Sequence, residues 1–306
     1  MKDILGYIAT YWREVDKRAL VICSLFTGIL IYFNYAHGLE LMLTSPGLWP
    51  LPAFTGHVVL FIIAFVIPHL VVQFSKKINE AMRTGLVVCL LLAPMIFALK
   101  MSIETQLSIG SSLHWMDYWN QILYWPVRLL IMLLLLVITW RIFHRDEGFY
   151  GLNKSSVNYR PYIIMLVIMV PLIALASTQP DFLRTYPKLH NVLPLPPGAE
   201  PSWWYKLLFE LSYGSDFVSI ELFFRGFLVI GIAKWVGKDA ILPMACFYCT
   251  IHFGKPLGEC ISSYFGGLLL GIVSYHTRSI YGGLMVHLGI AWLMEAGGYI
   301  GQALKG

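Results

Sequence analysis

The stretch Leu129–Thr139 reads LLIMLLLLVIT, and it decides the fold. Its side chains are apolar on every face of a helix, whereas a surface helix of a water-soluble domain keeps one polar face. Strands of an outer-membrane barrel would instead alternate apolar and polar residues. The stretch therefore predicts a helix that crosses a lipid bilayer.

The whole chain has the composition of a membrane protein. Of its 306 residues, 58% are hydrophobic and 13% are charged, whereas a typical soluble domain is about 25% charged. This composition excludes an ordinary soluble domain and a disordered chain. The five cysteines are too few, and odd in number, for a secreted disulfide scaffold. The net charge is +5, but the sequence has no run of basic residues long enough to follow a phosphate backbone. We therefore expect no nucleic-acid partner.

Nine segments approach the roughly 20 apolar residues that a helix needs to cross the hydrocarbon core. They are residues 19–36, 54–75, 85–101, 119–142, 161–178, 205–236, 239–253, 258–276 and 280–303. The sequence thus predicts an all-α, polytopic transmembrane helix bundle of eight or nine spans. Cytoplasmic loops collect Lys and Arg, and a cytoplasmic N-terminus places most of the 22 such residues inside. The first apolar run is longer than that of a signal peptide and no cleavage pattern follows it, so we expect a retained first span.

A proline-rich segment at residues 179–204 divides the chain and ends in the interfacial aromatic residues Trp203 and Trp204. We predict an N-terminal five-span membrane module at 1–178, an interfacial linker at 179–204 and a catalytic-type membrane module at 205–306. Ionisable residues inside a membrane are costly and usually functional. They concentrate in the last module, at Glu210, Asp216, Glu221, Arg225, His252, Glu259, His287 and Glu295.

Four of these residues form the candidate site. Glu221 and Arg225 lie four residues apart, on one face of a helix, and can pair. His252 and His287 lie on later predicted helices. One glutamate and two imidazoles suffice to activate a water molecule, and they could also bind zinc. The alternative is structural, with an ion pair that holds the bundle together and histidines that only pack.

The order of these residues resembles the CPBP intramembrane proteases, or Abi proteins, which are related to CAAX prenyl endopeptidases and to bacteriocin-processing and self-immunity proteins. The motifs are ELFFRG at 221–226, YCTIH at 248–252 and the late histidine of VHLGIA at 286–291. The resemblance covers about residues 205–306. It implies an intramembrane peptidase of a bacterial inner membrane that hydrolyses a membrane-anchored or lipidated peptide. By the same resemblance, the catalytic residues are Glu221, Arg225, His252 and His287.

Three positions depart from the family pattern. Ile220 stands where the first glutamate of a Glu-Glu pair is expected, Tyr248 replaces phenylalanine, and Ala291 replaces asparagine or aspartate. In the family, that first glutamate is taken as the base that activates water, and the last polar residue helps to hold the oxyanion. Two interpretations therefore remain: a peptidase that depends on glutamate or on a metal, or an inactive CPBP-like scaffold or self-immunity protein that binds a membrane peptide.

Two other carboxylates are candidates to replace the absent one. Glu259 follows His252 by seven residues, and Glu295 lies about two turns beyond His287. Their alternative roles are a partner for Lys255 and an interfacial residue. The predicted topology also places His287 about 10 Å deeper in the membrane than a tight cluster with Glu221 permits.

Two further patterns on the last spans favour packing over chemistry. Cys246 and Cys249 form a CxxC inside an apolar span, where thiols pack. Ser263, Gly267 and Gly271 repeat every four residues, a pattern typical of helices that approach closely.

Overall fold

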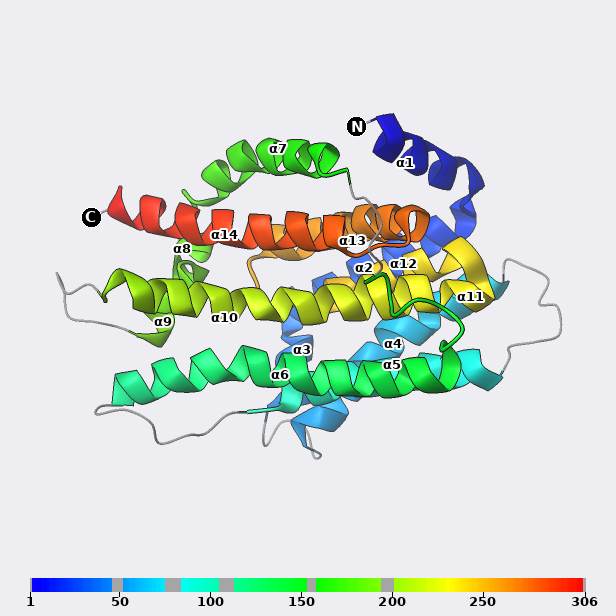
Figure 1. Cartoon of the computed structure of the whole chain (residues 1–306), viewed down its shortest axis with the longest axis horizontal. Helices are drawn as coiled ribbons and strands as arrows, with labels where there is room; N and C mark the ends of the chain where they lie inside the picture. The colour runs from blue at the N-terminus through cyan, green and yellow to red at the C-terminus, as the bar shows by residue number, and fades with distance from the viewer. Residues whose placement is uncertain are drawn as a thin grey trace. The chain divides into compact units, whose positions relative to one another are not determined.

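The structure is a computed structural model that describes residues 2–45, 52–74, 84–104, 113–152, 158–193 and 201–304. Within these ranges every regular element is a helix and no strand occurs, so the predicted all-α class is confirmed (Figure 1). The helices in chain order are α1 (Lys2–Glu14), α2 (Lys17–His37), α3 (Leu39–Thr44), α4 (Ala53–Phe74), α5 (Thr84–Ser102), α6 (Leu113–Phe143), α7 (Arg160–Ala176), α8 (Pro180–Thr185), α9 (Lys188–Val192), α10 (Trp203–Glu221), η1 (Leu222–Gly231), α11 (Ala233–Val236), η2 (Gly237–Ala240), α12 (Ile241–Thr250), α13 (Leu257–Thr277) and α14 (Tyr281–Ala303).

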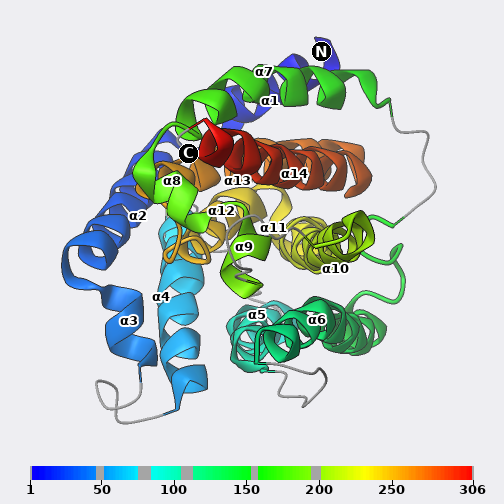
Figure 2. The same ribbon diagram turned by 90° about the vertical axis from the view of Figure 1, so that its left-hand side faces the viewer.

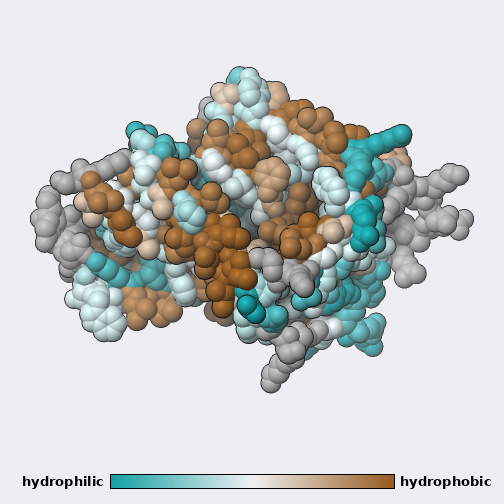
Figure 3. Space-filling view, turned by 90° about the horizontal axis from the view of Figure 1, so that it is seen from above, coloured by the Kyte–Doolittle hydropathy of each residue, from teal (hydrophilic) through white to brown (hydrophobic). Residues whose placement is uncertain are grey.

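Each predicted span corresponds to one helix or to a run of consecutive helices. Of the described helices, α2, α4, α5, α6 and α13 are long and apolar enough to cross a membrane. Large apolar side chains on them face outward, as at Leu25, Leu130 and Phe265, which are 64%, 65% and 63% exposed. Hydrophobic side chains cover broad areas of the face drawn in Figure 3. The protein is therefore an integral membrane protein built as a helix bundle, and the spans beyond these five stay a prediction.

The chain divides into two compact units, each built from segments that alternate along the sequence. We call them unit 1 (1–102, 134–155 and 222–280) and unit 2 (103–133, 156–221 and 281–306). The three modules predicted from composition along the chain stay a prediction.

In unit 1, small residues of α13 let it approach α12. A Cβ atom on Gly271 would lie 2.6 Å from Cε of Met244, and one on Gly267 would lie 3.0 Å from Cδ1 of Tyr248. The close helix approach predicted for these glycines is confirmed. Helix α4 packs against α3, α5 and α12, and Figure 2 shows α3 and α4 side by side.

The cysteines of unit 1 behave as packing residues. All five are free and buried. The two thiols of the CxxC motif turn to different helices: Cys246 lies beside Cys23 of α2, and Cys249 Sγ lies 3.9 Å from Cys260 Sγ of α13. The packing role predicted for the motif is confirmed.

In unit 2, helix α14 packs against α7, α8 and α10 (Figures 1 and 2). Glycines on α14 allow the approach, since a Cβ on Gly289 would lie 2.7 Å from Cδ2 of Leu166 and one on Gly298 would lie 2.5 Å from the nitrogen of Pro187. An aromatic cluster fills the space between α6, α9, α10 and α14; its buried members are Tyr118, Ile122, Trp125, Leu189, Leu193, Phe209, Tyr213, Phe217 and Ala291.

The proline-rich segment contains two short helices. Helix α8 begins at Pro180, because the first position of a helix needs no backbone N–H. Part of this segment, residues 194–200, lies outside the described residues. The predicted orientation also relies on four basic residues outside the described ranges, namely Lys76, Lys77, Arg83 and Lys154.

The helix that carries the ELFFRG motif changes its winding directly after Glu221. From Leu222 to Gly231 it is a π-helix, all of whose residues are buried, and the N–H of Ile232 donates to the carbonyl of Phe227, five residues back, at 3.1 Å. Such segments occur frequently at functional sites. The prediction that Glu221 and Arg225 share one face assumed α-helical winding, which ends between them.

Two glycines fit the π-helix against Tyr150. A Cβ on Gly226 would lie 2.7 Å from the Tyr150 carbonyl oxygen, and one on Gly231 would lie 2.9 Å from Cε1 of the same residue. The close approach of Tyr150 therefore explains why a glycine follows Arg225.

Candidate active site

Glu221 and His287 meet inside unit 2. Glu221 is the last residue of α10, and His287 lies in the second turn of α14. Nδ1 of His287 lies 3.0 Å from Oε1 of Glu221. The ring of Phe217, one turn before Glu221, packs edge-on against the imidazole with 4.7 Å between the ring centroids. The difference in depth expected between Glu221 and His287 is therefore wrong, because the two side chains are in contact within unit 2.

The contact fixes how the pair can handle protons. An ionised Glu221 carboxylate would accept this hydrogen bond, in which case Nδ1 of His287 carries the proton. The neutral ring then has its lone pair on Nε2. The Glu221 side chain has no exposed surface, whereas 13% of the His287 side chain is exposed. The imidazole is thus the member of this pair that a water molecule can reach.

Arg225 and His252 belong to unit 1, where Tyr248 connects them. The Arg225 guanidinium carbon lies 4.2 Å from the centroid of the Tyr248 ring, and both residues are buried. Nδ1 of His252 lies 3.0 Å from the Tyr248 carbonyl oxygen, and the two rings are 4.8 Å apart. Because a carbonyl only accepts, Nδ1 of His252 also carries its proton. Tyr248, which stands where the family pattern has phenylalanine, contacts both Arg225 and His252.

Helix α2 holds the turn that contains His252. Asn34 donates from Nδ2 to the Phe253 carbonyl at 3.1 Å, and the Tyr35 hydroxyl donates to the Lys255 carbonyl at 2.5 Å. These residues were not predicted as part of the site. An amide near the end of an otherwise apolar span is the signal that could have found Asn34.

The corner between α2 and α3 adds a carboxyl group to the same turn. Oε2 of Glu40 lies 3.9 Å from where a Cβ atom of Gly254 would stand, and the Glu40 N–H donates to Oδ1 of Asn34 at 3.0 Å. Burial raises the pKa of Glu40 to about 6, because a buried charge loses hydration.

The four predicted residues thus form two groups, Glu221 with His287 and Arg225 with His252. Convergence of all four on one pocket stays a prediction.

The two candidate replacement carboxylates have partners in the structure. Glu259 pairs with Lys255, with 3.5 Å between Oε1 and Nζ. Glu295 is buried and its Oε2 accepts a hydrogen bond at 2.9 Å from the backbone N–H of Lys188, at the start of α9. These contacts support the structural role for both. Ala291, where a polar residue was expected, lies within the aromatic cluster of unit 2.

The donor set for a metal ion is incomplete. Among the residues that the structure describes, no three His, Cys, Asp or Glu side chains come together as a metal ion would need. Glu221 and His287 instead bond to each other. A role for zinc stays a prediction.

Comparison with known proteins gives one match. Residues 203–293 match the family described as type II CAAX prenyl endopeptidase Rce1-like. No curated protein and no solved structure matches the chain. The matched segment contains Glu221, Arg225, His252 and His287, and it begins and ends close to the part of the chain in which the motifs lie. Residues 203–293, about a third of the chain, are thus similar to the Rce1-like type II CAAX prenyl endopeptidases, which agrees with the resemblance to the CPBP proteases that the motifs indicated.

Proposed function

We propose that this protein is an intramembrane peptidase that hydrolyses a membrane-anchored or lipidated peptide with water activated by a Glu–His pair. The observation that carries the proposal is the 3.0 Å contact between His287 Nδ1 and the buried carboxylate of Glu221. The family match supports a CAAX-type protease in general terms.

His287 acts as the general base in this proposal. Its Nε2 takes a proton from the attacking water, and the imidazolium that forms is stabilised by the Glu221 carboxylate at Nδ1. Glu221 is a positioning residue, since it fixes the tautomer and the orientation of the ring. We choose His287 and not Glu221 as the base, because the Glu221 carboxylate is buried and the His287 imidazole is partly exposed.

His252 positions the scissile carbonyl or the water. Its ring is held through Nδ1 by the Tyr248 carbonyl, and the Tyr248 ring lies against the Arg225 guanidinium. Arg225 is therefore also a positioning residue, which acts through Tyr248. A cation against an aromatic face in a desolvated place contributes about 2 kcal/mol, enough to order the group of Arg225, Tyr248 and His252.

The test is a cleavage assay with protein purified in detergent. The substrates are a farnesylated CAAX peptide and a panel of membrane-anchored peptides. We expect cleavage by the wild type, and its loss in Glu221→Gln, His287→Ala and His252→Ala. Glu259→Gln is the matched control, because it makes the same chemical change to a carboxylate that pairs with Lys255. Metal analysis of the same sample tests the zinc prediction.

Thermal unfolding of each variant separates loss of chemistry from loss of the fold. The proposal is contradicted if Glu221→Gln and His287→Ala keep their fold and cleave as fast as the wild type. It is also contradicted if the folded wild type binds these peptides but cleaves none of them.

The last outcome describes the second candidate function, an inactive scaffold or self-immunity protein that binds a membrane peptide. Ile220 and Ala291 favour it, since two positions that carry polar groups in the family are apolar in this chain. Ala291 packs among the aromatic residues of the unit 2 cluster.

A further inference from the structure

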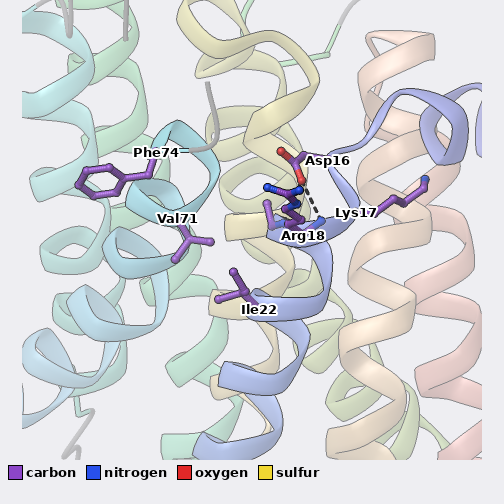
Figure 4. A pocket seen from close by; sticks show the side chains of 7 residues that line it. Asp16, Lys17, Arg18, Ile22, Val71 and Phe74 are labelled. Atoms are coloured by element: carbon purple, nitrogen blue, oxygen red, sulfur yellow. Dashed lines mark hydrogen bonds between the residues drawn. The ribbon is translucent and has the colours of Figure 1, made fainter. Parts of the chain in front are cut away.

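A cavity of about 690 Å³ opens in unit 1 where α2 begins and α4 ends. Its lining includes Asp16, Lys17, Arg18, Ile22, Val71 and Phe74 (Figure 4). Both helices are candidate membrane spans, and their ends at Lys17 and Phe74 mark the boundary of the apolar segments. In a bilayer that these two candidate spans cross, the cavity would lie near the depth where lipid headgroups meet acyl chains.

The polar side of the cavity has one accessible cation. Asp16 caps α2, with Oδ1 accepting from the amides of Arg18 at 2.8 Å and Ala19 at 3.1 Å, so these amides are already bonded. The Lys17 ammonium bonds to the Trp12 carbonyl, lies 4.4 Å from the centroid of a Trp12 ring, and points away from the cavity in Figure 4. Arg18 is exposed, and its side chain lies at the mouth of the cavity. Arg18 is therefore the cation that the mouth of the cavity offers to an anionic group, whereas the Asp16 carboxylate is engaged by the amides that it caps.

The wall below Arg18 is apolar. Ile22 follows Arg18 by one helical turn and is 50% exposed, and Phe74, at the end of α4, is 78% exposed. Figure 4 shows Ile22 and Val71 directed toward each other across the space between the two helices. A water-filled cavity would leave this surface unfavourably hydrated.

We infer that this cavity binds an anionic phospholipid. The phosphodiester group lies on the Arg18 guanidinium, which can form two parallel charge-assisted hydrogen bonds to it. An acyl chain covers Ile22, Val71 and the exposed face of Phe74. A soluble phosphate would use only the upper half of the site, whereas a phospholipid covers both halves. The inference does not depend on the proposed peptidase activity.

The test measures lipid binding to the full chain in detergent by native mass spectrometry. The lipids are phosphatidylglycerol and phosphatidylcholine with the same acyl chains. We expect tighter binding of phosphatidylglycerol, and Arg18→Gln weakens it about tenfold, as for loss of one strong charge-assisted contact. The matched control is Arg13→Gln, which removes the same charge from α1, where Arg13 donates to the Ala9 carbonyl and does not line the cavity.

Two more variants and one soluble competitor sharpen the result. Asp16→Asn removes a negative charge but keeps a good N-cap, so phosphatidylglycerol should bind more tightly. Ile22→Ser should weaken phosphatidylglycerol binding by removing the apolar contact, whereas glycerol phosphate should not compete. Equal effects of Arg18→Gln and Arg13→Gln, equal binding of the two lipids, or competition by glycerol phosphate at the concentration of the lipid would each overturn the inference.

Discussion

The two histidines of the candidate site are held in different ways. Nδ1 of His287 bonds to the carboxylate of Glu221, and Nδ1 of His252 bonds to the backbone carbonyl of Tyr248. A carboxylate stabilises an imidazolium far better than a neutral carbonyl does. The roles proposed for His287 as the base and for His252 as an orienting residue rest on this difference between their partners.

The supports of the two histidines also differ in whether a single substitution can remove them. The support of His287 is a side chain and can be removed by one substitution. The support of His252 is a backbone group, so it can be disturbed only through what holds the turn, namely Tyr248, Asn34 and the corner that contains Glu40. Substitutions at these places test the two roles separately.

The largest effect is expected for Glu221→Gln. The amide keeps the shape of the side chain but cannot stabilise an imidazolium, so kcat/KM should fall by about 10²–10⁴. The measurement is the cleavage rate beside the melting temperature of the purified variant. A folded variant that cleaves at the wild-type rate would show that His287 does not act as the base.

The second-largest effect is expected from removal of the Tyr248 ring, which lies against the Arg225 guanidinium. Tyr248→Leu removes the cation–π contact at 4.2 Å and leaves a cavity, so we expect the free energy of unfolding to fall by about 2–4 kcal/mol. Tyr248→Phe keeps the ring and should lose less than about 1 kcal/mol. Denaturant unfolding in detergent measures both. Equal losses would mean that the hydroxyl, and not the ring face, is what stabilises this place.

The turn of His252 should also respond to pH through Glu40. Its pKa rises from 4.5 in the unfolded chain to about 6 in the folded protein, so the folded state binds the proton more tightly. This contribution to stability is complete below pH 4.5 and is lost as the pH rises through 6, about 2 kcal/mol in total. Glu40→Gln should flatten that part of the stability curve between pH 4.5 and 7. A curve that keeps its slope in the variant would contradict the prediction.

Most of the fold could be predicted from the sequence, because burial in lipid leaves a strong signal. Apolar runs such as Leu129–Thr139, inside a longer apolar segment, are typical of a helix in a membrane, and each predicted span corresponds to helical structure. The short helices α8 and α9 could not be predicted in this way, because prolines usually mark irregular chain and their helices depend on tertiary contacts such as that of Glu295 with the Lys188 amide.

The membership of the candidate site stays a prediction, and the sequence could not show how its helices are wound. Residue type and order pointed to Glu221 and His287, and their contact agrees with that expectation. The expected pairing of Glu221 with Arg225 rests on a uniform α-helix and stays a prediction. The π-helix that begins at Leu222 depends on the approach of Tyr150 to Gly226 and Gly231, and such a long-range contact cannot be deduced from local spacing.

The smallest effect is expected for Glu259→Gln. Glu259 and Lys255 form a partly exposed pair at 3.5 Å, and such pairs contribute about 0.2–1 kcal/mol. Cleavage should change by less than about twofold, because a loss of 1 kcal/mol in stability leaves a folded protein folded and the pair does not hold either imidazole. The same assay and the same unfolding curve measure both quantities. A large loss of cleavage with an unchanged melting temperature would reverse the comparison between the histidines. It would mean that Glu259 is the carboxylate that catalysis needs, and that the Glu221–His287 pair only packs.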